Sequence, residues 1–390
     1  MIRRLLLISL MVVMVYSLYT SPCIAAEPVT VAIVCELSGA GAPSGMRWER
    51  GVLMGAEDLN ASGGILGRKI ETFSLDTKTE APTSVAAMRK AVERNPFVVM
   101  GTVYSGSTIV NMPILQKAGI PQFVGSEGPT ITKQGNPNIF LTSYNAELSM
   151  QKVVKWLTEV LKVRDMALVY ANTEMGKGGR DALIKLLTPK GVKFVADIGT
   201  EMGQADFTGE LARVKRSGAD TLFIYHHEEE CSRLLIQIRE LGLDKMMRTV
   251  GHVVLITENV IKLAKDASNG VMGQVEFSGV AAPLKPLAEK YLKKYGELPD
   301  HNFFKAYIGL QVVNAVVKET GSFDQQKFRD HIHNRTLCVK NHPGILMDVH
   351  YDEKGDVDRE SFLVKVENQK HVITGILDPL NPARFDRCKK

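Results

Sequence analysis

The chain has 390 residues, of which 48 are Lys or Arg and 43 are Asp or Glu, giving a formal net charge of +5 at pH 7. Its basic residues are spread without long runs, which argues against a nucleic acid as partner. The length suffices for two domains that each bury a core.

The first residues have the order of a secretory signal. A positive pair, Arg3–Arg4, precedes the mostly apolar stretch Leu5–Leu18, and the small residues Ala25–Ala26 follow. The apolar stretch is short for a membrane span. We therefore predict a cleaved signal peptide over residues 1–26 and a periplasmic location. A lipoprotein anchored through Cys23 is the alternative, although the proline before it departs from the usual lipidation pattern.

Short β-rich runs alternate with amphipathic stretches in the first part of the chain. The expected strands cover residues 29–37, 69–76, 97–101 and 121–125. The expected helices cover residues 46–61, 83–94 and 107–117. Such alternation predicts a parallel sheet with helices on both faces.

The same pattern restarts after residue 138. An extended segment over residues 138–144 is followed by expected strands at 166–170, 193–198 and 221–226, with helices at 146–161, 180–187, 207–216 and 232–241. The fold class is therefore α/β, with two doubly wound parallel-sheet lobes joined by a hinge.

The last part of the chain differs from both series. It begins with successive helices expected at residues 284–295, 303–318 and 325–333. Leu346–Tyr351 and Phe362–Val366 then flank the turn Asp352–Asp356, which predicts a β-hairpin.

The segment Gly101–Thr108 is the leading candidate for a binding site. It follows an apolar strand, opens a helix and carries the hydroxyls of Ser105 and Ser107. Free amides at a helix N-terminus bind anions, and ligands of open α/β sheets bind at the carboxyl ends of strands. Its spacing approaches that of a phosphate loop, but serine replaces the essential lysine, so a carboxylate fits better than a nucleotide. Simple helix capping is the alternative.

Other polar clusters do not form recognisable metal or catalytic sites. His226–Glu230 lacks further ligands at metal-site spacing and is typical of an acidic first helical turn. Asp352–Asp358 lacks the order of a calcium loop. We expect no metal, no cofactor and no catalytic residues. An exported α/β enzyme stays an alternative, since catalytic groups can be dispersed along a sequence.

Four cysteines remain beyond the signal region, at wide and irregular spacing: Cys35, Cys231, Cys338 and Cys388. This spacing contains no CxxC metal or redox motif. In an oxidising compartment Cys338 and Cys388 could pair and fix the C-terminal tail, or all four could be independent thiols.

Several segments resemble the periplasmic branched-chain amino-acid (Leu/Ile/Val) binding proteins. The opening run over residues 31–71 contains SGAGAPSG and the turn NASGGILGRK, and the later matches include GTVYSGST, GADTLFIYHHEEE and VHYDEKGD. The resemblance covers nearly all of the chain beyond the signal region. It implies a type I periplasmic binding fold with three crossovers between lobes and a cleft that closes on its ligand.

The resemblance also implies the limits of the lobes. The amino-terminal lobe would comprise Glu27–Thr142 and Phe277–Met347. The second lobe would comprise Ser143–Glu276 and Asp348–Lys390.

Candidate ligand-binding residues follow from matching segments. The ligand carboxylate would be held by Ser105, Gly106 and Ser107, and by Gly125, Ser126 and Glu127. The family's aromatic contacts from the second lobe fall at Met175 and His227. Trp48, Tyr104, Met175 and Val253 are candidate walls, with ordinary core packing as the alternative for Trp48 and Met175.

One departure from the family affects the ligand. The acidic residue that pairs with the ligand's ammonium falls near Val253 here. Burying an unpaired ammonium costs several kcal/mol. Either Glu127 or Glu228 therefore replaces the missing charge, or the ligand is an aromatic or apolar organic acid without an ammonium.

The function that these residues imply is solute capture without catalysis. We expect a monomeric extracytoplasmic protein that delivers a small carboxylate to the permease subunits of an ABC importer. A ligand sensor of the same fold, feeding a signalling receptor, is the alternative.

Overall fold

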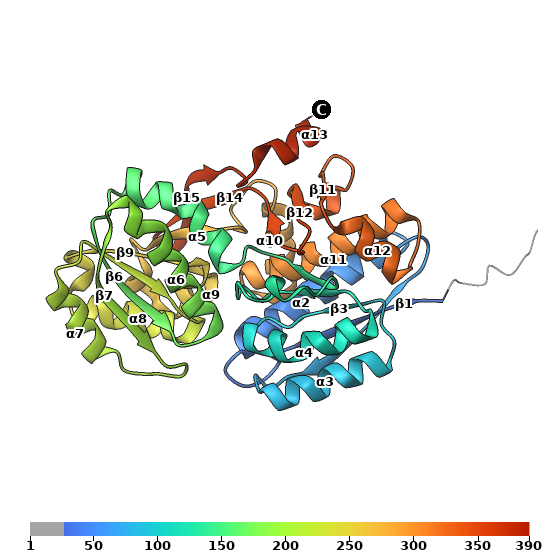
Figure 1. Ribbon diagram of the computed structural model, residues 1–390, viewed down its shortest axis with the longest axis horizontal. Coiled ribbons are helices and arrows are strands. Elements are labelled where there is room, and N and C mark those ends of the chain that lie inside the picture. Colours follow the sequence, from blue (N-terminus) through green and yellow to red (C-terminus); the bar gives the residue numbers. More distant parts are fainter. Residues whose placement is uncertain (1–26, 390) are drawn as a thin grey trace, which may run out of the picture.

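The computed structural model describes residues 27–389, so the predicted signal peptide lies outside the described residues. Two α/β lobes lie side by side (Figure 1). Among the described residues, no helix combines the length and the apolar character needed to cross a bilayer.

The first lobe is built on a five-stranded parallel sheet in the order β2-β1-β3-β4-β5. Strands β3, β4 and β5 are short runs of apolar or uncharged residues, all of them buried, as expected where helices cover both faces. The strands are β1 (Val29–Cys35), β2 (Ile70–Asp76), β3 (Val98–Met100), β4 (Gln122–Val124) and β5 (Ile139–Leu141). The helices are α2 (Ala42–Ala61), α3 (Ala81–Glu93), α4 (Ser105–Ala118), α10 (Lys285–Tyr295), α11 (His301–Thr320) and α12 (Gln325–Ile332).

The second lobe holds a seven-stranded sheet in the order β15-β14-β10-β9-β8-β6-β7. Strands β10, β9, β8, β6 and β7 run parallel, and β14 and β15 add an antiparallel edge. The strands are β6 (Asp165–Ala171), β7 (Lys193–Thr200), β8 (Thr221–Tyr225), β9 (Arg248–Gly251), β10 (Met272–Val275), β14 (Ser361–Glu367) and β15 (Lys370–Leu377). The helices are α5 (Ala146–Lys155), α6 (Glu174–Leu187), α7 (Thr208–Ser217), α8 (Glu228–Glu240) and α9 (Glu258–Ala264).

The predicted terminal hairpin is partly wrong. The turn Asp352–Asp356 joins β12 (Val349–Tyr351) to the short β13 (Val357–Asp358), and β11 (Arg335–Leu337) completes this small sheet. The expected partner, Phe362–Val366, instead lies in β14 of the second lobe. The chain leaves the small sheet immediately after β13, so β13 and β14, which lie on either side of Arg359, do not pair with each other.

The small sheet belongs with the first lobe. The ring of Tyr351 packs edge-on against Phe123 and Phe140, with ring centroids 6.2 Å and 6.1 Å away. We therefore propose that the last crossing between lobes lies at Arg359 rather than after Met347. The other lobe limits predicted from the sequence, after residues 142 and 276, directly follow β5 and β10.

A buried tyrosine connects the three segments that pass between the lobes. The backbone N of Tyr144 donates to Glu276 Oε1 at 2.7 Å, and the backbone N of Arg359 donates to the Tyr144 hydroxyl oxygen at 2.9 Å. The Tyr144 hydroxyl also lies 3.1 Å from Asp358 Oδ1. These contacts hold the hinge segments in one polar cluster.

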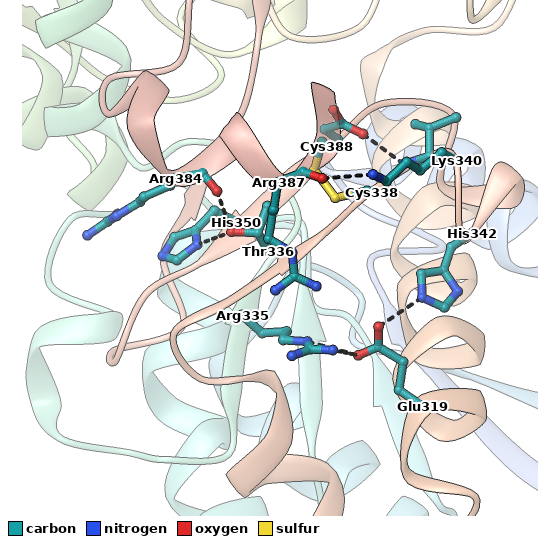
Figure 2. Close-up of a disulfide and its surroundings, with 12 residues drawn as sticks. Glu319, Arg335, Thr336, Cys338, Lys340, His342, His350, Arg384, Arg387 and Cys388 are labelled. Atoms are coloured by element: carbon teal, nitrogen blue, oxygen red, sulfur yellow. Dashed lines mark hydrogen bonds and ion pairs between the residues drawn. A yellow bond between two sulfur atoms is a disulfide. The ribbon is translucent and has the colours of Figure 1, made fainter. Parts of the chain in front are cut away.

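Cys338 and Cys388 form a disulfide, which resolves the alternative that the sequence left open, whereas Cys35 and Cys231 are buried free thiols. The bond attaches the C-terminal helix α13 (Asp386–Lys389) beside the small sheet (Figure 2). Lys340 Nζ donates to the Arg387 carbonyl at 2.8 Å, which reinforces the attachment.

The disulfide closes a loop with a sequence separation of 50 residues. Cross-linking a loop of that size restricts the unfolded chain, so Cys388→Ser should lower the free energy of unfolding by about 2–4 kcal/mol. Denaturant titration of the oxidised protein and of the variant measures the difference. Cys231→Ser, which alters a thiol outside the bridge, tests whether thiol loss alone has this effect. An unchanged unfolding midpoint for Cys388→Ser would contradict the prediction.

Candidate functional site

A cavity lies between the lobes, next to the carboxyl ends of strands from both sheets. The space in it that the centre of a water molecule can occupy is about 40 Å³, and the cavity is partly open to solvent. The lining also contains residues that were not singled out from the sequence as ligand contacts, among them His301, Asn302 and Lys305 of α11. The predicted site residues that line it are Tyr104, Ser105, Gly125, Glu127, Met175 and His227.

The lobes touch around this cavity, so the structure is a closed one. The ring of Tyr104 stacks on that of His227, with centroids 4.9 Å apart and planes at 10°. Ser44 Oγ of the first lobe donates to Glu228 Oε1 of the second at 3.2 Å. Burial lowers the pKa of His227 to about 4, and the nearby His226 adds to this shift, so the stacked imidazole is neutral at pH 7.

The turn before α4 differs from the sequence-based expectation in one respect. The amides of Val103 and Tyr104 donate to the carboxylate of Glu36 at 3.1 Å and 3.3 Å. Burial raises the pKa of Glu36 to about 7, and the hydrogen bond from Val103 opposes the shift. Part of the predicted anion-binding turn is therefore occupied by a carboxylate of the protein itself.

The first turn of α4 keeps unused donors. Within residues 27–389, the backbone N–H groups of Ser105, Gly106 and Ser107 donate to no protein acceptor. The hydroxyl oxygen of Ser105 accepts from the Gly128 amide at 3.0 Å, which leaves its own hydrogen available. An anion next to Ser105 would meet these donors at the positive end of the helix.

The loop after β4 is held by a buried ion pair. Lys305 Nζ donates to the Gly125 carbonyl at 3.0 Å and also pairs with Glu127. His252 Nε2, from the second lobe, lies 2.8 Å from the other oxygen of Glu127. Burial by itself raises the pKa of Glu127, but the charges of Lys305 and His252 outweigh this effect and hold that pKa well below its ordinary value. The charge of Glu127 is therefore already compensated inside the protein.

Glu228 is the cavity carboxylate without an ion-pair partner among the described residues. Its oxygens accept from the neutral groups of Ser44, Asn302 and Asn259 at 3.2, 3.3 and 3.1 Å. Burial raises its pKa to about 7, and the charge of Asp300 adds to the shift. Of the two glutamates proposed from the sequence as replacement charges, Glu228 is the one left free to receive a donor.

Five predicted site residues lie outside the cavity lining. Trp48 is fully buried behind Gly125, where a Cβ would lie 2.8 Å from the indole, so its position is that of a core residue. Val253 is also buried and its neighbour Val254 lines the cavity instead. The hydroxyl of Ser126 bonds to Thr108 Oγ1 at 2.6 Å, away from the cavity. The remaining two, Gly106 and Ser107, lie beside the lining on α4.

Sequence reasoning missed the contribution of α11. Residues 301–317 of this helix are all buried, because it packs closely against α2. A lysine and a histidine in a buried, mostly apolar helix need buried partners. Lys305 and His301 within this helix were therefore a detectable signal in the sequence, but the family resemblance did not point to these positions.

A closed cavity between two doubly wound lobes, lined by side chains of both, defines a two-lobed binding protein. The model of the family described as periplasmic binding protein matches residues 28–371, so the chain belongs to that family. It is a family of binding proteins rather than enzymes.

Known relatives agree with this assignment. The chain is 26% identical over 343 residues to an amino acid binding protein of Pseudomonas aeruginosa, covering 86% of this chain and 89% of that protein. A Streptococcus pneumoniae branched-chain amino acid substrate-binding protein, solved with isoleucine, shares the fold with a TM-score of 0.80 at 21% identity, over 91% of this chain and 100% of that one. A Rhodopseudomonas palustris solute-binding protein, solved with 3,4-dihydroxybenzoic acid, gives a TM-score of 0.82 at 19% identity, over 91% and 98%.

A cluster of carboxyl groups near the cavity should make closure depend on pH. The side chain of Glu258, in the second lobe, is 15% exposed and is influenced by the charge of Asp300 in the first lobe, and Arg47 Nε lies 3.5 Å from Asp300 Oδ2. Burial raises the pKa of Glu258 to about 8, and Asp300 and Glu228 add to the shift, whereas Arg47 opposes it. His371 Nδ1 lies 3.5 Å from Glu258 Oε1 on the other side.

In the open form these carboxyls gain water and their pKa values return toward the ordinary range. The closed form therefore binds more protons, and it loses stability as pH rises from the ordinary glutamate pKa to about 8. We expect the radius of gyration of ligand-free protein, measured by small-angle X-ray scattering, to increase between pH 6 and about 8.5. Glu258→Gln should flatten this dependence, while Glu240→Gln, which alters an exposed glutamate of the same lobe, should not. A pH-independent radius in the parent protein would exclude this control of closure.

Proposed function

We propose that this protein captures a small carboxylate in the periplasm and delivers it to an ABC importer. The support is its family membership together with the ligands of its relatives. Isoleucine and 3,4-dihydroxybenzoic acid, bound by two proteins of the same fold, both carry a carboxylate. A carboxylate is therefore the chemical group that the two ligand classes share.

The observation that carries the proposal is the unused donor set at the start of α4. The hydroxyl of Ser105 and the first amides of the helix are the groups that an incoming carboxylate needs, and Ser105 lines the inter-lobe cavity. Hydrogen bonds to a charged group contribute about 1.5–3 kcal/mol each. The second lobe faces this turn with Met175 and the His227 ring.

Ligand capture would work through the equilibrium between open and closed forms. A ligand stabilises the closed form only through contacts that it gains there. A carboxylate held by Ser105 of the first lobe gains such contacts when Met175, His227 and Glu228 of the second lobe close over it. The closed form would then be recognised by the permease subunits.

Export and assembly complete the proposal. The predicted signal peptide over residues 1–26 would direct the chain to the periplasm, where the disulfide between Cys338 and Cys388 can persist. We propose that the protein acts as a monomer, because each chain contains both lobes of its own cavity.

Removing the Ser105 hydroxyl tests the carboxylate site. Ser105→Ala deletes one charge-assisted donor and should weaken every carboxylate ligand about tenfold or more. Leucine, isoleucine, benzoate and 4-hydroxybenzoate would first be screened by thermal shift, and affinities then measured by calorimetry. Ser107→Ala, on the same turn but outside the cavity lining, is the matched control. Equal affinity in the Ser105→Ala and parent proteins would remove Ser105 from the site.

A further inference from the structure

A second group of polar side chains lines the cavity apart from the Ser105 turn. Glu228 begins α8, and His301 and Asn302 begin α11. We call these three residues the α8–α11 wall. They are 5%, 5% and 2% exposed, so their hydrogen-bonding groups are almost wholly withdrawn from solvent.

Glu228 retains capacity for one more donor. A carboxylate offers about four lone-pair positions, and three are taken by Ser44, Asn259 and Asn302. None of these donors carries a charge, although Arg47 is close enough to influence Glu228. A further donor that reaches this incompletely hydrogen-bonded, buried carboxylate would therefore form a stabilising hydrogen bond.

His301 presents a second unmet requirement. Its buried Nδ1 has no hydrogen-bond partner among residues 27–389. Burial lowers the pKa of His301 well below its ordinary value, and the charge of Lys305 adds to the shift, so the ring is neutral and can exchange a hydrogen bond with an uncharged group. Native proteins seldom leave such an atom unpaired.

Few aliphatic side chains line the cavity. They are Val103, Met175 and Val254, while Trp48 and Val253 lie outside the lining. A ligand with a purely aliphatic tail would exclude water from the α8–α11 wall without replacing its hydrogen bonds, which is unfavourable.

We propose that the ligand is a carboxylate whose tail carries a hydroxyl group, and that Glu228 accepts a hydrogen bond from this hydroxyl while His301 lies beside it. This rests on the carboxylate site proposed above and adds the chemical class of the tail. The α8–α11 wall selects hydroxylated acids over isosteric acids that end in a methyl group.

Isosteric ligand pairs test this directly. 4-Hydroxybenzoate against 4-methylbenzoate, and homoserine against norvaline, each exchange a hydroxyl for a methyl group of similar size. For whichever pair binds, calorimetry should show that the affinity for the hydroxylated acid is about tenfold or more higher than that for the methyl analogue. Glu228→Ala should reduce that preference to about twofold or less. If circular dichroism shows that this variant is unfolded, Glu228→Gln, which keeps the side-chain volume, replaces it.

A matched control separates ligand contact from lobe closure. Thr130 Oγ1 donates to Glu174 Oε1 at 2.7 Å across the lobes without lining the cavity, so Thr130→Val should weaken both members of a pair equally. Equal affinity for hydroxyl and methyl ligands would overturn the inference and leave the carboxylate site standing. A preference that persists in both Glu228 variants would overturn the assignment to Glu228. Failure of all four acids while leucine, isoleucine or benzoate binds would overturn the inference alone, and failure of every one of these acids would contradict the proposed function itself.

Discussion

The arrangement of the cavity depends on one buried carboxylate shared between the lobes. Glu127 pairs with Lys305 of its own lobe and, at 2.8 Å, with His252 of the other. Buried charges are tolerated only when they are paired, and removing one partner costs several kcal/mol. The same glutamate therefore fixes the loop after β4, explains a lysine inside the apolar helix α11, and joins the closed lobes at the cavity. Because its charge is used in this way, we propose that Ser105 and Glu228, rather than Glu127, recognise the ligand.

Much of the fold could be predicted from the sequence because alternation of strands and helices leaves a clear pattern. The helices of the first lobe begin within about four residues of their predicted starts, as α2 and α4 show. Strands β9 and β10 were missed because their sequences, RTVG and MGQV, mix polar residues and glycine with few apolar ones, unlike the apolar runs that marked β3 and β5. The terminal hairpin was misassigned because local sequence gives no sign that the chain changes lobes at Arg359.

The candidate site was predictable where binding groups belong to a local motif. Ser105 could be found because it follows a strand at the edge where ligands bind, and Gly125 because its segment matches the family that the sequence resembles. The sequence could not show that a side chain distant in the chain would occupy a donor of the motif, and Glu36 is such a side chain. It lies 67 residues before Val103, yet its carboxylate takes the amide that the motif offers to a ligand. Trp48 shows the opposite error, since a large aromatic residue near the site in sequence is fully buried in the core.

The C-terminal tail has a consequence for how far the lobes can separate. After β15 of the second lobe, the amides of Leu380 and Asn381 both donate to the Asp358 carboxylate at 2.8 Å, and the tail then reaches Cys338 beside the first lobe. The disulfide makes this return path a fourth, covalent tether in addition to the three hinge segments. A tether of this kind limits how far the lobes can rotate apart, and reduction of the disulfide would remove that limit.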